Sequence, residues 1–296
     1  MHPTRSVFYK YQSAATAIAV LSARRLRWSS PLSFNDPFDV TQTLRLDIDP
    51  AVLQPVLVDA FINVLKNPAP PAAATIQLKL IHTLFWRATR PSDRDSILDE
   101  LRSTSGSPTA GGINAFDELQ KTWNGLVPQF RILCLSESPT ITPMWNHYAD
   151  AYKGTVLEFQ ADVSVDSALQ LAKPVIYQDT PPRIADVNEW ARAIVETNGK
   201  RFHELFREMQ YVKATSWAYE KEWRVVSYAR PDSSGLTSDL GFHPKEVRGL
   251  YLGPNTLPAD EAVLRSLLVG DLNHVTVYKG RLPTGKATAF LFNPSA

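Results

Sequence analysis

Two glutamates and an arginine at alternate positions could form a polar site. They are Glu220, Glu222 and Arg224. On a β-strand, alternate side chains share one face at intervals of about 7 Å, so these three would lie together. The residues between them include Trp223, which with Val225 would face the core. A glutamate in such a site could bind or polarise a hydroxyl group, while the arginine holds an anion. The alternative is a solvated strand face with a weak ion pair.

An aromatic pair lies some seventy residues before this segment. If Pro143 begins a helix, Trp145 and Tyr148 fall on one face of it, three residues apart. Their rings could stack on a base or on a nicotinamide ring. The alternative is a place in the core, where the tyrosine hydroxyl would need a hydrogen-bond partner.

A turn motif occurs near the N-terminus. Residues 34–39 read Phe-Asn-Asp-Pro-Phe-Asp. Asn35 and Asp36 can hydrogen-bond to nearby backbone, and the two phenylalanines can anchor the turn. Both polar residues are candidate ligand-binding groups, and the alternative is that they only stabilise the turn.

A lysine between two tyrosines forms the fourth motif. Lys10 stands between Tyr9 and Tyr11 in a short stretch that is typical of a strand. Lys10 and Tyr11 are candidate ligand-binding residues. The alternative is a solvated strand lysine.

The familiar signatures of several enzyme classes do not occur in the sequence. There is no GxxxxGK[ST] loop, no GxGxxG after a strand, no HExxH and no GxSxG. The six histidines and the single cysteine have no zinc-site spacing. We therefore expect no metal, and common nucleotide hydrolases, Rossmann dehydrogenases and zinc proteases are disfavoured. Cys134 lies in an apolar strand-like segment, which favours an inert buried thiol over a nucleophile.

The composition is that of an ordinary globular protein. The 296 residues are 44% hydrophobic and 21% charged, so the chain can bury a substantial core. Its 31 Lys and Arg against 30 Asp and Glu disfavour an extended surface for duplex nucleic acid. A lone cysteine fits a reducing compartment. No signal peptide and no uncharged apolar run of about 18 residues are present. We expect a cytoplasmic protein without a membrane span.

Hydrophobic patterning predicts an α+β fold. We expect one α/β domain over residues 1–296, with a mixed, mostly antiparallel sheet, a helical insertion at about 50–125 and a C-terminal strand-helix-strand part at 244–296. Ser13 and Asp49-Pro50 are helix start signals, and a long helix is expected over 186–211. The expected strands are 7–11, 26–29, 130–135, 155–159, 173–177, 223–228, 247–252, 275–278 and 287–292.

The four motifs, in this order, resemble those of a bacterial family of uncharacterised proteins, domain of unknown function 2971. The resemblance spans Val7 to Val226, with the helical block as its variable part. The family has no established general function, so the resemblance implies little about the activity.

A second resemblance, to ADP-ribosyltransferases, implies an NAD-consuming enzyme. In that family a basic or aromatic N-terminal strand, a middle strand ending in serine and a late Glu-x-Glu occur in the same order. Here Lys10 stands where Arg or His is usual, and Ser136 begins Ser-Glu-Ser in place of Ser-Thr-Ser. By position, Glu222 would bind the nicotinamide ribose and stabilise an oxocarbenium-like transition state, while Glu220 assists the acceptor.

The same resemblance implies roles for the remaining motif residues. Tyr148, Trp145 or Tyr11 would stack on nicotinamide, and Arg224 or Lys10 would hold phosphate. Such an activity would suit a toxin or a phage-defence effector.

Two other functions are compatible with these residues. Asp36, Asp39 and Glu222 could surround the metal ion of a nuclease or phosphodiesterase. The motifs could also belong to a non-catalytic module that senses a nucleotide or docks a partner. Release of nicotinamide from NAD would distinguish the enzyme from the module.

Overall fold

The chain forms two compact units, each built from separate stretches of sequence. Unit 1 comprises Met1–Thr41, Val127–Asp179 and Tyr211–Ala296, and unit 2 comprises Gln42–Leu126 and Thr180–Gln210. The computed structural model describes residues 5–41, 43–72, 74, 76–104, 111–180, 182–196, 204, 206–231, 233–281 and 291–295.

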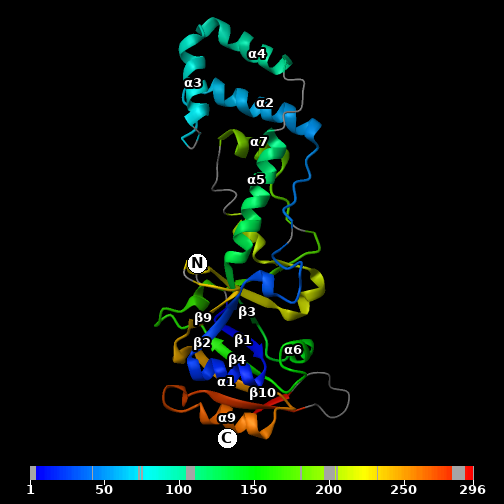
Figure 1. Ribbon diagram of the computed structural model, residues 1–296, viewed down its shortest axis with the longest axis vertical. Helices are drawn as coiled ribbons and strands as arrows, with labels where there is room; N and C mark the ends of the chain where they lie inside the picture. Colours follow the sequence, from blue (N-terminus) through cyan, green and yellow to red (C-terminus); the bar gives the residue numbers. More distant parts are fainter. Residues whose placement is uncertain are drawn as a thin grey trace. The chain divides into compact units, whose positions relative to one another are not determined.

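A ten-stranded sheet forms the centre of unit 1 within the described residues (Figure 1). The strand order is β12-β11-β10-β4-β1-β3-β2-β9, and β8 joins β3 and β5 beside this path. All the neighbouring pairs are antiparallel except β10 and β11. The predicted α+β class with a mixed, mostly antiparallel sheet is therefore confirmed. The strands are β1 (Val7–Gln12), β2 (Arg25–Ser29), β3 (Phe130–Ser136), β4 (Thr155–Gln160), β5 (Lys173–Pro174), β8 (Glu222–Tyr228), β9 (Thr237–Gly241), β10 (Val247–Leu252), β11 (Thr276–Arg281) and β12 (Leu291–Pro294).

Strand β3 is the point at which this sheet divides. One edge of β3 pairs with β8 along its whole length. The other edge pairs with β1 only at Tyr9 and Ser136, and with β2 only at Ser29 and Ile132. Strands β1 and β2 therefore diverge from one edge of β3, on either side of Cys134. We call this divergence the split.

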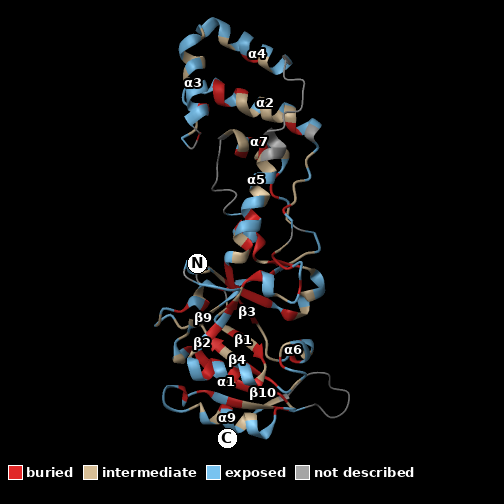
Figure 2. Cartoon of the chain, viewed as in Figure 1, coloured by how far each residue is buried: buried red, intermediate tan, exposed pale blue. Residues whose placement is uncertain are grey.

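One face of the sheet carries the main apolar core. Alternation along β3 and β8 puts Leu133, Leu135, Trp223 and Val225 on this face, all with at most 7% of their surface exposed. The predicted core positions of Trp223 and Val225 are confirmed. Helices α1 (Ala14–Ala23) and α9 (Pro258–Ser266) pack against each other and contribute apolar side chains to the same core. Figure 2 shows buried residues in this sheet, around the labels β1, β2 and β3.

The start of α1 follows from a local signal. Ser13 has an extended backbone, and its hydroxyl accepts a hydrogen bond from the backbone N–H of Thr16. This contact satisfies one of the free donors at the helix start, as the sequence predicts.

Helix α6 (Thr142–His147) lies on the opposite face of the sheet. Its residues Met144 and Trp145 pack with Tyr11, Val156 and Tyr251 in a second apolar cluster. The turn that follows α6 contains Gly154. A Cβ atom there would fall onto the carbonyl oxygen of Gln12 and lie 2.9 Å from Ala149 Cα, so glycine is required for close approach of the two segments.

Two predicted elements of unit 1 differ from the structure. The expected strand at 173–177 is two short strands in different sheets, because β6 (Ile176–Tyr177) leaves β5 and pairs in parallel with β7 (Val212–Lys213). The expected strand at 287–292 begins outside the described residues, and β12 covers Leu291–Pro294.

Helices build unit 2. They are α2 (Pro50–Lys66), α3 (Ile76–Ala88), α4 (Arg94–Thr104), α5 (Gly111–Leu126) and α7 (Val187–Glu196). Ile62, Leu65 and Leu98 form a buried cluster between α2 and α4, and α7 packs against α2. Residues 180–210 thus join the helical block, and a backbone hydrogen bond of 2.9 Å from Ile184 to Arg45 links its two stretches of sequence. The expected helix over 186–211 ends at Glu196 in α7; residues 197–203 and 205 lie outside the described ones, and 206–209 are helical.

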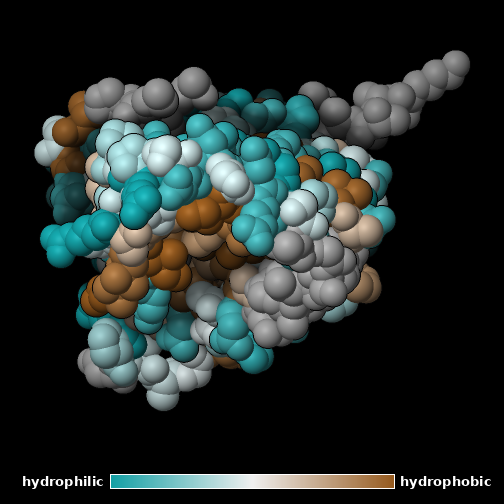
Figure 3. Space-filling view, turned by 90° about the horizontal axis from the view of Figure 1, so that it is seen from above, coloured by the Kyte–Doolittle hydropathy of each residue, from teal (hydrophilic) through white to brown (hydrophobic). Residues whose placement is uncertain are grey.

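Part of the molecular surface is apolar, as the brown areas of Figure 3 show. Helix α3 in unit 2 exposes Ile76, Leu80, Ile81 and Leu84. No helix within the described residues has both the length and the apolar content needed to cross a membrane.

Candidate functional site

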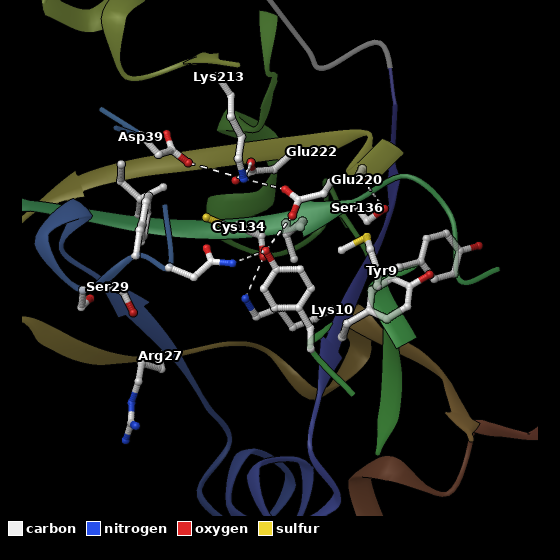
Figure 4. A pocket seen from close by; sticks show the side chains of 18 residues that line it. Tyr9, Lys10, Arg27, Ser29, Asp39, Cys134, Ser136, Lys213, Glu220 and Glu222 are labelled. Atoms are coloured by element: carbon white, nitrogen blue, oxygen red, sulfur yellow. Dashed lines mark hydrogen bonds and ion pairs between the residues drawn. The ribbon is translucent and has the colours of Figure 1, made fainter. Parts of the chain in front are cut away.

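A cavity of about 290 Å³ opens at the split in unit 1 (Figure 4). Its walls come from β1, β2 and β3, from the segment 33–39, and from Met144 and Tyr148 at the end of α6. Three charged residues complete the wall: Lys213, Glu220 and Glu222. Concave sites with a few convergent polar groups are where small ligands bind.

The ammonium group of Lys213 holds three carboxylates together. Lys213 Nζ lies 2.6 Å from Glu220 Oε2, 3.1 Å from Glu222 Oε2 and 3.4 Å from Asp39 Oδ2. All four side chains are at most 5% exposed. Burial disfavours the charged lysine, but the three carboxylates outweigh burial and raise the pKa of Lys213. Lys213 therefore stays cationic.

Arg224 provides the second cation, behind the cavity wall. Its side chain is fully buried, and Nε donates to Glu222 Oε1 over 2.8 Å. One Nη donates to Glu222 Oε2 over 3.0 Å and to Asp39 Oδ2 over 2.6 Å. Three carboxylates thus face two cations, so the cluster carries one net negative charge when all five groups are ionised.

The two glutamates have opposite pKa shifts. Burial alone would raise the pKa of Glu222, but Arg224 and Lys213 outweigh burial and lower it to about 2. Burial also raises the pKa of Glu220, and there Lys213 and Tyr148 offset the effect only in part. Two neighbouring carboxyl groups with separated pKa values are typical of sites that need one permanent anion and one group that exchanges protons.

Tyr148 links α6 to this cluster. Its hydroxyl donates to Glu220 Oε1 over 2.6 Å and accepts from Asn35 Nδ2 over 3.1 Å. Burial and the adjacent Glu220 raise the pKa of Tyr148, so it remains a neutral donor.

The backbone around the two glutamates differs from the predicted strand. Glu220 ends a short 3₁₀-helix that begins at Thr215, Lys221 adopts a left-handed conformation with φ of 47°, and β8 begins only at Glu222. The prediction that Glu220 lies on the same strand as Glu222 and Arg224 was wrong. The three side chains still converge, because the left-handed turn brings Glu220 back beside Glu222.

Two hydroxyl groups hold this turn in place. Ser136 Oγ donates to the carbonyl oxygen of Glu220 over 2.7 Å, and the backbone N–H of Glu222 donates to Tyr177 Oη over 2.7 Å. Ser136 therefore acts on the backbone of Glu220, while its side chain also lines the cavity.

Lys10 closes part of the split. Its ammonium donates to the carbonyl oxygen of Cys134 over 2.8 Å, at the position where β1 and β2 leave the edge of β3. Cys134 is half-buried as a residue and lines the cavity, whereas the sequence predicts a buried residue. Burial nevertheless raises its pKa, so Cys134 is a poor nucleophile.

Part of the chain matches a known family model. Residues 144–225 match the model described as Protein of unknown function (DUF2971). Over this segment the chain resembles DUF2971. No curated protein and no solved structure matches the chain. The match is shorter than the predicted span from Val7 to Val226.

The segment that matches this family model supplies most of the charged cluster. Tyr148, Lys213, Glu220, Glu222 and Arg224 all fall within residues 144–225. Lys10, Asn35 and Asp39 lie outside the DUF2971 match and reach the same cavity from the N-terminal part of unit 1.

Three predicted ligand-binding residues have partners within the protein. Asp36 does not line the cavity, and its Oδ1 accepts the backbone N–H of Phe38 over 2.9 Å, as in a simple turn. Trp145, in the DUF2971 segment, is fully buried and donates to the carbonyl oxygen of Pro139. Tyr11 lines the cavity, but its hydroxyl donates to Ser138 O and its ring packs edge-on against Trp145.

The carboxylates face cations of the protein rather than one another. Among the described residues, no group of three or more His, Cys, Asp or Glu side chains is arranged to hold a metal ion. Asp39 and Glu222 share Arg224, and Asp36 is turned into its own loop.

Sequence reasoning missed Lys213 and Tyr177. Lys213 stands in the two-residue strand β7, and Tyr177 in the two-residue strand β6. Elements this short have no periodicity to reveal which way a side chain points. Only the pairing of β6 with β7 brings both residues to the cluster.

Proposed function

We propose that the protein is an enzyme that uses NAD as a substrate and transfers its ADP-ribose group to an acceptor. The bond between ribose C1′ and the nicotinamide nitrogen breaks, and its electron pair neutralises the positive ring nitrogen. Ribose C1′ gains positive charge and is attacked by an acceptor O–H or N–H, which loses its proton. Such a reaction needs a fixed anion near C1′ and a group that accepts a proton.

The observation that carries this proposal is the ionised, buried carboxylate of Glu222 in the wall of the cavity. Its pKa of about 2 means that it is negative at any physiological pH. Because the cluster has one more carboxylate than cation, it favours a developing positive charge on a bound sugar. A preorganised anion in a site with little water is more effective than one in bulk solvent.

Glu220 is suited to be the group that accepts the proton of the acceptor. Its raised pKa makes it a better proton acceptor than an ordinary carboxylate. It lines the same cavity, and Lys213 holds it beside Glu222.

Lys10 supports recognition of the phosphate groups. It lines the cavity, and its described partner is a neutral carbonyl oxygen rather than a carboxylate. An ammonium with that environment suits a pyrophosphate. Arg224 does not, because it is fully buried and bound to two carboxylates.

A second candidate is a module that binds a nucleotide without reaction. One observation favours it: both oxygens of Glu222 already accept hydrogen bonds from Arg224. A carboxylate bound in this way could have only a structural role in the cavity wall and take no part in a reaction.

Nicotinamide release distinguishes the two candidates. Purified protein is incubated with NAD, and nicotinamide is measured by liquid chromatography for the wild type, Glu222→Gln and Glu246→Gln. Glu246 is a matched control, because it is equally buried but is bound to Ser167 away from the cavity. We expect release to fall by roughly 10²-fold in Glu222→Gln and to persist in Glu246→Gln. Binding of NAD without release would support the module, and neither binding nor release would overturn the use of NAD.

A further inference from the structure

Arg27 on β2 is a cation of the cavity to which the proposed reaction gives no role. It belongs to the cavity wall, and 64% of its side chain is exposed, so it lies at the rim. Its Nε donates to Asp239 Oδ1 over 3.2 Å. The two terminal nitrogens have no hydrogen-bond partner among the residues that the structure describes. Their N–H donors are therefore accessible to a ligand in the cavity.

Alternation along β2 directs Arg27 to the cavity face of the sheet. Trp28, the next residue, belongs to the main core, so Arg27 and Ser29 point to the opposite face. Ser29 lines the same cavity, which agrees with this direction. Ser29 also pairs with Ile132 on β3, so Arg27, two residues away, stands level with Cys134.

Lys10 reaches the same level of β3 from the other side of the split. Its ammonium donates to the carbonyl oxygen of Cys134 over 2.8 Å. The two cations therefore line the cavity from two diverging strands, β1 and β2. The carboxylates of the cavity wall gather instead around Lys213, which lies apart from Lys10 and Arg27 in Figure 4. The cavity thus has a cationic part and an anionic part.

We propose that Arg27 and Lys10 together bind a pyrophosphate group, one phosphate each, so that the site selects a ligand with two linked phosphates over a monophosphate. This inference rests on the proposed function for the direction of the ligand, whose ribose C1′ faces Glu222 while its phosphates extend toward the rim. A guanidinium can donate two parallel hydrogen bonds to one phosphate, and an ammonium binds the next as a compact charge.

The test compares the binding of ADP with that of AMP, which differ only in the second phosphate. Isothermal titration calorimetry gives both dissociation constants for the wild type, Arg27→Met and Arg25→Met. Arg25→Met is the matched control, because it removes the same charge from the same face of β2 but Arg25 does not line the cavity. Both variants should fold, since the two arginines have exposed side chains and bind only to Asp239 among the described residues.

We expect the wild type to bind ADP at least about tenfold more tightly than AMP. Arg27→Met should reduce this ratio to about threefold or less, and Arg25→Met should keep it. The same ratio in Arg27→Met and the wild type would overturn the inference. An equal fall in both variants would also overturn it, because the effect would then come from the general charge of the strand, and so would failure of both nucleotides to bind.

Nicotinamide release, measured on the same proteins, separates this inference from the proposed function. Release by the wild type with a ratio that does not depend on Arg27 would overturn only the pyrophosphate site. A ratio that falls in Arg27→Met, without release of nicotinamide by the wild type, would support the pyrophosphate site and overturn the transfer reaction.

Discussion

The hydroxyl of Tyr148 donates a hydrogen bond of 2.6 Å to Glu220, a residue 72 positions further along the chain. This bond joins the end of α6 to the turn that precedes β8. It also stabilises the ionised form of Glu220, and therefore lowers the pKa that burial raises.

Replacement of Tyr148 by phenylalanine tests this relationship. Without the donor, the pKa of Glu220 rises further, so the acid limb of the pH profile of nicotinamide release should move to higher pH. We also expect kcat to fall by roughly tenfold, as for loss of a hydrogen bond to a charged group. Tyr251→Phe is the matched control, because Tyr251 makes an equal 2.6 Å bond to Glu158 outside the cavity wall. If both variants keep the wild-type pH profile, Glu220 does not control the acid limb.

The low pKa of Glu222 predicts a stability effect in acid. Its folded-state pKa of about 2 lies below the ordinary value of 4.5, so ionised Glu222 stabilises the fold above pH 4.5 and this contribution is lost as the pH falls toward 2. The shift corresponds to about 3 kcal/mol. We expect the free energy of unfolding of the wild type to exceed that of Glu222→Gln at pH 7, and the difference to shrink by about this amount near pH 2. Urea denaturation of both proteins across this range measures it.

The wild type must be compared with Glu222→Gln because two neighbouring carboxyl groups have the opposite effect on the pH dependence of stability. Burial raises the pKa of Asp39 and Glu220, so their ionisation destabilises the fold as the pH rises through the folded-state pKa. A difference between wild type and Glu222→Gln that stays constant with pH would contradict the low pKa of Glu222.

Removal of Arg224 should destabilise the protein strongly. Arg224→Met leaves Glu222 and Asp39 buried with Lys213 as their remaining cation, which costs about 3–5 kcal/mol for a broken buried ion pair. The double variant Arg224→Met, Asp39→Asn removes one of the uncompensated charges and should recover part of the loss. Arg27→Met is the control, because Arg27 pairs with Asp239 on the surface and should cost less than about 1 kcal/mol. Equal unfolding free energies for the two arginine variants would refute the role of Arg224.

Loss of Lys10 should weaken the binding of NAD and leave the rate of the chemical step nearly unchanged. In Lys10→Met the cavity loses the cation that we assign to the pyrophosphate, so KM for NAD should rise about tenfold while kcat changes little. Arg25→Met, at the exposed start of β2, is the control and should keep the wild-type KM. A fall in kcat with KM unchanged would instead place Lys10 near the reacting atoms.

Local patterns predicted much of the sheet. Phe130 to Leu135 and Val247 to Leu252 are short, mostly apolar segments, and both form strands as expected. The start of α1 follows from one hydroxyl, that of Ser13, which accepts the backbone N–H of Thr16 three residues further on. Strand patterns and helix caps depend on residues that are close together in the sequence, so they can be predicted from the sequence alone.

The candidate site was predictable only in part. Alternation of side chains along β8 places Glu222 and Arg224 on one face. The left-handed conformation at Lys221 could not be predicted, because the position is not a glycine. The position of Lys213 depends on the parallel pairing of two short strands, 36 residues apart, between Ile176 and Val212. The extent of unit 2 likewise depends on a long-range contact between residues near 45 and 184. None of these contacts has a local signal.

The geometry of β3 has a spectroscopic consequence. In an antiparallel ladder the N–H and C=O of one residue point to the same side, and Glu137 bonds to Lys221 on the β8 side. Leu133 and Leu135 share that direction, so their amides are locked to β8, while the peptide group of Cys134 points into the cavity beside Lys10. The Cys134 amide should exchange with deuterium faster than the amides of its two neighbours, and its resonance should shift when a molecule enters. One backbone proton thus reports occupancy of the cavity, independent of any reaction.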